Sequence, residues 1–400
     1  MRVRMPLALF AVALLVRLLF NIFVMGLENS GLELFPDGKE YDALGLSLAE
    51  GSGYAQNQSP DTYRPPGYPL FLAAVYALFG HSIAVVKILQ SILDAATCVM
   101  ILLIGERLFT RRVGVIAGAI AAVYPFLIVY TGFVLSETLF VFLSTVFLYA
   151  LVRFREDSSW RWVAVAGLLL GVMNLTRPAT LFLPVLLFCW LWVEMGTRRR
   201  AAVIAAALAC WMLVPILPWT VRNYLVRHSF ILIADHHWAA LYAANNRQIL
   251  QDPDKIGGWI QPQGGEDYRS EYLAFIRRTV IHEPLELVRL EFHKLHRFWS
   301  IVPTSSRTTF RDTLISFCSY GVLLPFFVGG MALSLKMPQT PWLLFFWILN
   351  FCLMALILYG STRFRAPIEP ALLLFGAFAL EKVWLACARE RKGSSLQKVA

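Results

Sequence analysis

A carboxylate in the first polar stretch of the chain is placed where it could act as a general base. Asp37 follows the apolar segment 6–27 by about a dozen residues, and Tyr41 and the leucines between 44 and 48 then recur at helical spacing. We therefore expect a short surface helix that begins near Asp37 and holds it at the membrane surface. This carboxylate could accept a proton from a hydroxyl if apolar neighbours raise its pKa toward the working pH. The alternative is that Asp37 only caps the helix.

Arginines at the ends of other apolar segments could bind an anion. Charged groups at membrane depth are costly and usually mark function, and guanidinium is the preferred protein partner of phosphate. Because several arginines are expected on one face, a phosphorylated lipid that enters from the bilayer is the expected ligand. Each arginine could instead snorkel or bind a lipid head group without a catalytic role. The residues are Arg177, Arg222, Arg363 and Arg365, with Glu137 as an acidic neighbour.

The composition places the elements that must position these residues in a membrane. Apolar residues make up 58% of the 400 residues and charged residues 16%, with a mean hydropathy of +0.60, whereas a soluble domain has about 45–50% and 25%. This excludes an ordinary soluble enzyme, a disordered protein and a secreted disulfide scaffold. We predict an all-α polytopic membrane protein with about ten transmembrane helices. The expected spans are 6–27, 82–105, 113–132, 136–152, 161–177, 179–195, 201–218, 313–335, 341–359 and 367–386. Spans 161–177 and 179–195 are short, and the alternative for them is a pair of half-height helices that meet near the outer face.

The distribution of basic residues predicts the orientation of these spans. A net charge of +10 first suggests a nucleic-acid partner. However, 17 of the 36 basic residues fall on one side of the ten-span arrangement, as the positive-inside rule requires. We therefore interpret the charge as a topology signal, with both termini in the cytosol, membrane lipids as partners and no nucleic acid.

Two outer segments are long enough to build a site, and they divide the chain into three regions. The first outer loop, 28–81, belongs to an N-terminal transmembrane module, 1–218, that carries the candidate base. Residues 67–80 of this loop are apolar but too short to span, so we expect a helix in the interface. The second outer loop, 219–312, is expected to be helical, since long loops in a compact protein are usually functional. C-terminal transmembrane helices and a cytosolic tail make up 313–400.

Two charged residues in the middle of apolar segments predict a structural pair. Arg17 lies about 16 Å from the inner end of the first span, at about 1.5 Å per residue, and Asp94 lies at a similar depth in the second. We hypothesise that they form a buried pair that holds the first two spans together.

Segment 285–299 predicts an amphipathic helix that rests on the membrane. Its apolar residues recur every three or four positions, which places His293, Lys294 and His296 on the polar side or flank of the helix. The two histidines could instead bind a metal, but their spacing matches no strong ligand motif.

The polar motifs on the outer side, taken in order, resemble those of the GT-C glycosyltransferases. The nearest branch is the bacterial group related to aminoarabinose transferase and protein O-mannosyltransferase. The likeness extends over residues 1–385. It rests on DGKEY at 37–41, GSGY at 51–54, YRPPGYP at 63–69, SE at 136–137, PWTVRN at 218–223, Tyr242 with NN at 245–246, and RFRAP at 363–367.

The resemblance implies a membrane glycosyltransferase with a GT-C-like fold. It would move a sugar from a polyprenyl-phosphate-linked donor to a hydroxyl acceptor (lipid, glycan or protein) on the outer face of the bacterial cytoplasmic membrane, with inversion at the anomeric carbon. Matched position by position, Asp37 would be the base, and Arg64 and Arg177 would contact the donor phosphate. We extend the phosphate-binding role to Arg222, Arg363 and Arg365.

The resemblance also bears on metal binding and on supporting residues. Glu137 matches an acidic position beside the phosphate and is the only candidate ligand for a divalent cation; no other cofactor is expected. In the aminoarabinose branch an acid precedes the basic–proline pair, but Tyr63 stands there in this chain, so one potential metal ligand is missing. Supporting roles are expected for Tyr41, Tyr63, Glu137, Asn245 and Asn246.

Two other classes of protein are alternatives. A transporter or lipid flippase tends to carry polar groups at mid-membrane and broken helices in paired repeats. Here most candidate groups lie at one interface and the sequence shows no repeat, which favours the enzyme. A non-catalytic envelope-assembly subunit would keep the fold without the chemistry.

Overall fold

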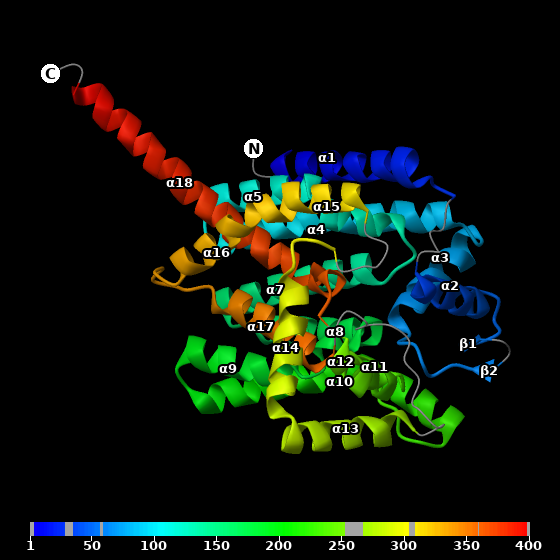
Figure 1. Ribbon diagram of the computed structural model, residues 1–400. Helices are drawn as coiled ribbons and strands as arrows, with labels where there is room; N and C mark the ends of the chain where they lie inside the picture. The colour runs from blue at the N-terminus through cyan, green and yellow to red at the C-terminus, as the bar shows by residue number, and fades with distance from the viewer. Residues whose placement is uncertain are drawn as a thin grey trace.

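The computed structural model describes residues 4–28, 35–56, 59–252, 267–303, 309–358 and 360–397. In these ranges most residues are helical, and the strands form one short antiparallel ribbon of β1 (Ala55–Gln56) and β2 (Ser59–Pro60). Figure 1 shows long helices that run side by side in one bundle. The predicted all-α polytopic membrane fold is confirmed.

Six helical segments in the described part of the chain are long and apolar enough to cross a membrane. A seventh candidate is bent by 56°, and the break falls where Pro125 cannot donate a backbone hydrogen bond. The bent segment joins α5 (Arg111–Val123) to α6 (Pro125–Ile128) and η2 (Val129–Gly132). The six are α1 (Arg4–Phe20) with η1 (Asn21–Met25), α4 (Ile83–Leu108), α7 (Glu137–Asp157), α10 (Arg198–Arg227), α15 (Phe310–Ser316) continuing through η6 (Phe317–Gly321) into α16 (Val322–Ser334), and η7 (Thr362–Ile368) with α18 (Glu369–Gln397).

Four shorter apolar helices change the predicted number of spans. They are α3 (Gly67–Phe79), α8 (Trp160–Thr176), α9 (Leu183–Met195) and α17 (Trp342–Ile357). The 13 residues of α9 extend about 20 Å, less than the hydrocarbon core of about 30 Å. Every predicted span coincides with a helix. Only six or seven of these helices are long and apolar enough to cross a membrane. The others are shorter because polar turns, such as Arg177–Pro178, interrupt the apolar sequence.

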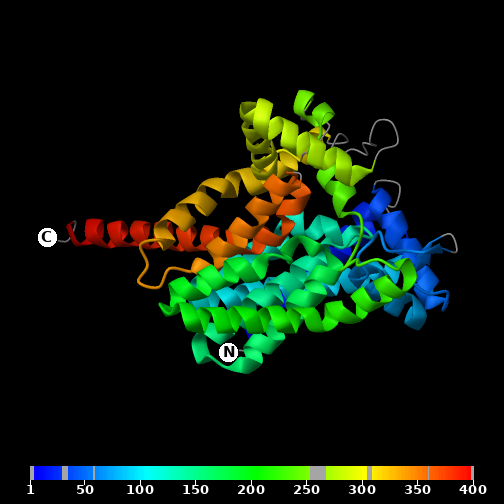
Figure 2. The ribbon, with the colours of Figure 1, turned by 90° about the horizontal axis from the view of Figure 1, so that it is seen from below.

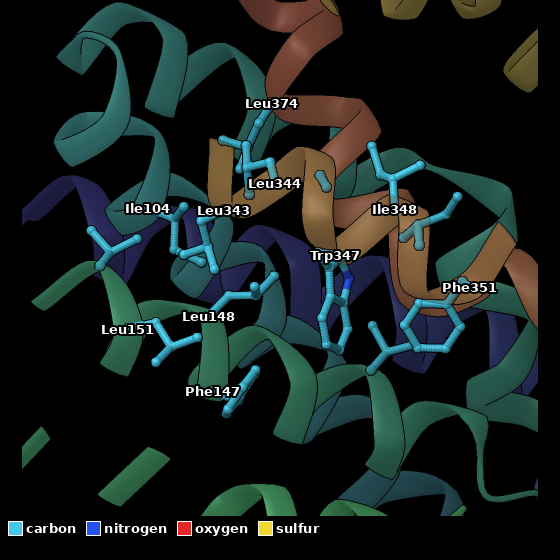
Figure 3. Close-up of a cluster of buried hydrophobic side chains, with 14 of the residues drawn as sticks. Ile104, Phe147, Leu148, Leu151, Leu343, Leu344, Trp347, Ile348, Phe351 and Leu374 are labelled. Atoms are coloured by element: carbon cyan, nitrogen blue, oxygen red, sulfur yellow. The ribbon is translucent and has the colours of Figure 1, made fainter. Parts of the chain in front are cut away.

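A buried apolar cluster joins helices that are far apart in the sequence (Figure 3). The ring of Trp347 lies 5.9 Å from that of Phe147 and 4.9 Å from that of Phe351, and its indole N–H donates to the carbonyl oxygen of Pro367 at 2.9 Å. This packing holds α17 and η7 against α7, so the C-terminal helices and the N-terminal module form one bundle. The other labelled side chains are Ile104, Leu148, Leu151, Leu343, Leu344, Ile348 and Leu374.

The predicted pair between the first two spans is confirmed. Arg17 Nε donates to Asp94 Oδ2 at 2.6 Å, and both side chains are buried. The remaining guanidinium donors reach the carbonyl oxygens of Ala122 at 2.7 Å and Ala121 at 3.1 Å. One arginine therefore ties α1 to α4 and to the end of α5.

The second outer loop is helical, as predicted, in the part that is described. It contains α11 (His237–Ala244), α12 (Arg247–Gln251), α13 (Tyr268–His282) and α14 (Pro284–Trp299). Figure 2 shows α13 and α14 rising from one side of the bundle. Residues 253–266 and 304–308 of this predicted loop lie outside the described residues.

The orientation of α14 corrects the sequence analysis at Lys294. Its side chain is fully buried, with Nζ donating to Asn245 Oδ1 at 2.6 Å and to the carbonyl oxygen of Leu356 at 2.8 Å. The apolar stripe instead points away from the bundle, since Leu285 is 81% and Phe292 72% exposed. Lys294 was wrongly placed on the polar side, because the face that packs on α17 is the one that carries it.

Candidate active site

Asp37 lies in the first turn of α2 (Pro36–Ala49), the surface helix that the sequence predicted. Pro36 starts the helix, where its fixed φ is favourable and its missing N–H is not needed. Tyr41 and Leu44 bury one face of α2, and Gly45 allows contact with α3, since a Cβ on it would lie 2.7 Å from Leu72 Cβ. The alternative role of Asp37 as a cap does not hold, because the N-cap position is Phe35 and, among the described residues, no side-chain hydrogen bond caps this helix end.

The Asp37 carboxylate bridges two arginines from opposite ends of the sequence. Arg64 Nη2 donates to Asp37 Oδ1 at 2.8 Å, and Arg363 Nη1 donates to Asp37 Oδ2 at 3.0 Å. Arg64 also donates through Nε to Glu40, one turn along α2. The Asp37 side chain remains 30% exposed, so a ligand can reach it.

A second carboxylate extends this arrangement into the bundle. Glu137, at the start of α7, is 1% exposed at its side chain. Its Oε1 accepts from Arg363 Nε and pairs with Arg177 Nη1 at 2.7 Å, whereas its Oε2 is buried without a hydrogen-bond partner among the described residues. We name the continuous set Asp37, Arg64, Glu137, Arg177 and Arg363 the Asp37 cluster.

The backbone around the cluster is held by close packing and aromatic rings. Gly67 follows the Arg64-Pro-Pro turn, and a Cβ there would lie 2.5 Å from Thr176 Oγ1. Glycine therefore lets the start of α3 pack on the end of α8, which brings Arg64 toward Arg177. Cation–π contacts orient the guanidinium groups: Arg64 with Tyr41 (5.6 Å) and Tyr63 (5.3 Å), Arg177 with Phe364 (4.9 Å), and Arg363 with Phe35 (5.4 Å).

The electrostatics at Asp37 differ from the sequence-based expectation. Burial alone would raise the pKa of its carboxyl group, but the positive charges of Arg363 and Arg64 outweigh burial and lower the pKa below its usual value. The condition set for the base, a pKa raised by apolar neighbours, is not met in this state, because the neighbours are cations as well as apolar groups. Asp37 is therefore ionised at neutral pH, as a base must be, and its proton affinity is low while both arginines contact it.

Two of the predicted phosphate ligands are placed elsewhere. Arg222 donates to the backbone carbonyl oxygens of Tyr54 and Asp61, so it fastens the first outer loop to α10. Arg365 is fully buried, pairs with Glu369 at 2.7 Å and donates to the carbonyl oxygen of Ser300 at 2.7 Å. Residues two apart on a 3₁₀ helix point in different directions, which separates Arg365 from Arg363. Both assignments are corrected, since these guanidinium groups serve the protein's own backbone and carboxylate.

The predicted supporting residues also divide between two places. Tyr41 and Tyr63 contact Arg64, as described above, but Asn245 and Asn246 lie on the second outer loop outside the cluster. Asn245 accepts from Lys294, and Asn246 caps α12 by accepting from two backbone N–H groups at 2.9 and 3.0 Å.

Glu40 and His236 are neighbours of the cluster that sequence reasoning missed as site residues. Glu40 pairs with Arg64, and its position three residues after Asp37 on one helix face was the available signal. His236 packs on Tyr63, with ring centroids 5.5 Å apart. Burial and the charge of Arg64 lower the pKa of His236 to about 4, so its ring is neutral at neutral pH and adds no charge to the cluster.

The described residues offer few ligands for the divalent cation that the resemblance raised. No group of three His, Cys, Asp or Glu side chains comes together in the described ranges. The free Oε2 of Glu137 is one carboxylate oxygen, and its partner oxygen is occupied by two arginines. These residues do not make a metal site by themselves.

Comparison with known proteins supports the sequence resemblance. Residues 63–221 match the model of the family described as dolichyl-phosphate-mannose-protein mannosyltransferase. This range includes Arg64, Glu137 and Arg177 but neither Asp37 nor Arg363. No curated protein sequence matches the chain.

Two solved structures share the fold at low sequence identity. ArnT from Cupriavidus metallidurans, bound to undecaprenyl phosphate, has a TM-score of 0.58 at 16% identity, and the similarity covers 95% of this chain and 60% of that one. The archaeal oligosaccharyltransferase AglB from Archaeoglobus fulgidus, in complex with an inhibitory peptide and a dolichol-phosphate, has a TM-score of 0.62 at 17% identity. This similarity covers 99% of this chain and 52% of that one. The chain thus spans a little over half the length of each. The chain is therefore similar to this mannosyltransferase family over residues 63–221, and it shares its multi-pass membrane fold with ArnT and AglB.

Proposed function

We propose that the protein transfers a sugar from a polyprenyl-phosphate-linked donor to a hydroxyl acceptor, with Asp37 as the general base. The observation that carries the proposal is the Asp37 carboxylate, which is held by Arg64 and Arg363 and is still 30% exposed. Lipid phosphates bound to ArnT and to AglB support the class of donor. The positive-inside pattern supports a location of this end of the bundle on the outer face of the cytoplasmic membrane.

The reaction needs only a base, an aligned acceptor and charge neutralisation at the leaving group. Asp37 takes the proton of the acceptor hydroxyl while the acceptor oxygen attacks the anomeric carbon of the donor. The bond from that carbon to the phosphate oxygen breaks, its electron pair stays on the phosphate, and the configuration inverts. Arg64, Arg177 and Arg363 neutralise the charge that develops on the departing polyprenyl phosphate.

The ion pairs of the Asp37 cluster couple donor binding to the strength of the base. Without donor, Arg363 and Arg64 lower the pKa of Asp37. A bound phosphate competes with the carboxylate for the same guanidinium groups, so their effect on Asp37 weakens and its proton affinity rises. The base therefore becomes stronger when the leaving group is in place.

A comparison of two aspartates on one helix tests this function. Asp42 lies five residues after Asp37 on α2 and accepts from Tyr76, outside the cluster. We expect Asp37→Asn to lower transfer from labelled polyprenyl-phosphate sugar in membranes by about 10²- to 10⁴-fold and to leave most of the donor unconsumed, whereas Asp42→Asn retains transfer at matched expression.

The two other classes of protein give different results in the same assay. Full transfer by Asp37→Asn, or rescue of a deletion strain by it, would favour an assembly subunit. Movement of labelled lipid across the membrane without sugar transfer by the wild-type protein would favour a flippase.

A further inference from the structure

A large cavity lies at the end of the bundle opposite the Asp37 cluster. Its volume is about 730 Å³. α7 separates the two regions, because it begins at Glu137 and its last turns, 152–156, line the cavity. The 21 residues of α7 extend about 31 Å. The cavity is therefore a separate site, on the other side of the membrane from the candidate active site.

Short helices explain why the bundle is hollow there. α9 and α17 have 13 and 16 residues, about 20 and 24 Å, and neither reaches across a hydrocarbon core of about 30 Å. α9 ends and α17 begins at this cavity, and the longer helices α4, α7 and α10 surround it. The hollow thus opens at the level where those longer helices reach the bilayer surface.

The lining is mainly polar and charged, with Glu156 and Glu194 beside the basic side chains, and it has a smaller apolar part. Three arginines reach the cavity, but two of them already have carboxylate partners: Arg107 pairs with Glu156 at 2.9 Å, and Arg155 pairs with Glu194. Arg200 is exposed and forms no ion pair within the described ranges. Its charge is available to an anion. The apolar part includes Leu108, Val152, Leu191, Val193 and Trp342.

A buried donor without an acceptor lies on the same cavity. Trp190 lines it and is 1% exposed, and its indole N–H has no hydrogen-bond partner among the described residues. Buried donors without a partner are rare in folded proteins, because a donor that is removed from water loses its water acceptor and needs another one. The indole nitrogen has almost no accessible surface, so a ligand oxygen in the cavity supplies an acceptor only when the side chains that cover the indole move aside.

The outer surface of α9 gives the cavity an apolar approach from the bilayer. Val185 is 65% and Val193 53% exposed on this helix, and such side chains suit contact with acyl chains. Near the cavity, the guanidinium of Arg198 lies 4.1 Å from the ring centre of Trp192. Tryptophan beside arginine is typical of the head-group level of a membrane.

We propose that this cavity binds the head group of an anionic phospholipid from the adjoining leaflet. Arg200 and the indole N–H of Trp190 donate to the phosphate, and the acyl chains lie along α9. Inorganic phosphate offers the same charge but leaves the apolar part of the lining and the exposed apolar face of α9 without a partner, so the lipid is the better match.

The full-length protein in detergent, titrated with phosphatidylglycerol and followed by native mass spectrometry, tests this site. We expect Arg200→Ala to weaken binding about fivefold, the effect of one basic residue near an anionic head group. Arg199→Ala is the matched control, because it removes the same charge from the neighbouring exposed residue, which does not line the cavity. Its affinity should stay within about twofold of wild type. Trp190→Phe, which keeps a ring but removes the donor, should also weaken binding.

Three results would overturn the proposal. Equal losses for Arg200→Ala and Arg199→Ala would mean diffuse attraction to a basic surface. Equal affinity for phosphatidylcholine would exclude selection for an anionic head group, and displacement of phosphatidylglycerol by inorganic phosphate at similar concentration would identify free phosphate as the ligand. Thermal unfolding midpoints of each variant show whether a loss reflects folding instead of the site.

Discussion

The Arg17–Asp94 pair and the Asp37 cluster use the same groups, a guanidinium and a carboxylate at hydrogen-bond distance. The side chains of Arg17 and Asp94 are 0% and 2% exposed, and the other donors of Arg17 go to backbone carbonyl oxygens and to Cys98. Asp37 is 30% exposed, and Arg363 is 21% exposed. The difference shows that the first arrangement has no route for exchange of partners, whereas the second can exchange a carboxylate for an incoming anion.

The two arrangements should respond differently to the loss of one charged side chain. A buried pair that loses one member leaves an uncompensated charge in a dry interior, which costs about 3–5 kcal/mol. In the Asp37 cluster, three arginines and two carboxylates contact each other and Glu40. When one of these side chains is removed, its former partner still contacts another charged group of the cluster or water. Arg17–Asp94 should therefore control folding, and the Asp37 cluster should control activity.

The largest expected effect is on catalysis. Asp37→Asn should lower turnover by about 10²- to 10⁴-fold, the usual contribution of a positioned base, and should move the unfolding midpoint by no more than about 2 °C. Sugar transfer and thermal unfolding are measured on the same preparation. A loss of stability that accounts for the lost activity would make Asp37 a structural partner like Asp94.

The next effect is on stability. Arg17→Leu and Asp94→Leu should each lower the free energy of unfolding by about 3–5 kcal/mol, and the double variant should lose much less than the sum. Denaturant unfolding in detergent measures these values. Additive losses would show that the two side chains do not stabilise each other.

A smaller effect distinguishes the arginines within one motif. Arg363→Lys removes the fork that contacts both Asp37 and Glu137, and should raise the KM for the donor about tenfold, since lysine cannot replace paired guanidinium bonds. Arg222→Lys, whose partners are backbone carbonyl oxygens, should leave the KM for the donor near the wild-type value. Equal changes in both variants would exclude Arg363 as a specific phosphate ligand.

The smallest expected effect is on the pH profile. Arg64 is a positive charge that lowers the pKa of Asp37, so Arg64→Gln must raise that pKa. Because only the ionised carboxylate accepts a proton, the acidic limb of kcat/KM should move to higher pH. Arg177, a weaker influence on the pKa of Asp37, should give a smaller shift when replaced by Gln. A shift to lower pH would contradict the assignment of Asp37 as the base.

Sequence reasoning found Asp37, Arg64, Glu137, Arg177 and Arg363, but it also included Arg222 and Arg365. All of these arginines lie at the ends of apolar segments, which the sequence shows directly. What it does not show is which donors are already used by the protein. Arg365 lies two residues from Arg363, yet the 3₁₀ turn of η7 directs it to Glu369 in the core.

Short helices and α14 illustrate the same limit. Half-height helices were an alternative for 161–177 and 179–195, and the structure gives short helices there. The apolar run at 341–359 predicted a full span, and the structure gives a helix too short to cross the core, which begins at the cavity by Trp190. Lys294 has the sequence position of an exposed residue on an amphipathic helix, but packing of α14 on α17 buries it with Asn245 and Leu356 as acceptors. A short stretch of sequence does not show which other element a helix packs against, and that packing decides which of its side chains are buried.

The sequence by itself determined the membrane class, the helical segments, the surface helix at Asp37 and the Arg17–Asp94 pair. These follow from hydropathy, periodicity and depth, which are local properties of the chain. Only the tertiary structure decided which charges meet, which of them remain exposed, and that the pKa of Asp37 is lowered and not raised. Electrostatic interaction depends on distances of a few ångströms between residues as far apart in sequence as Asp37 and Arg363, and only folding fixes those distances.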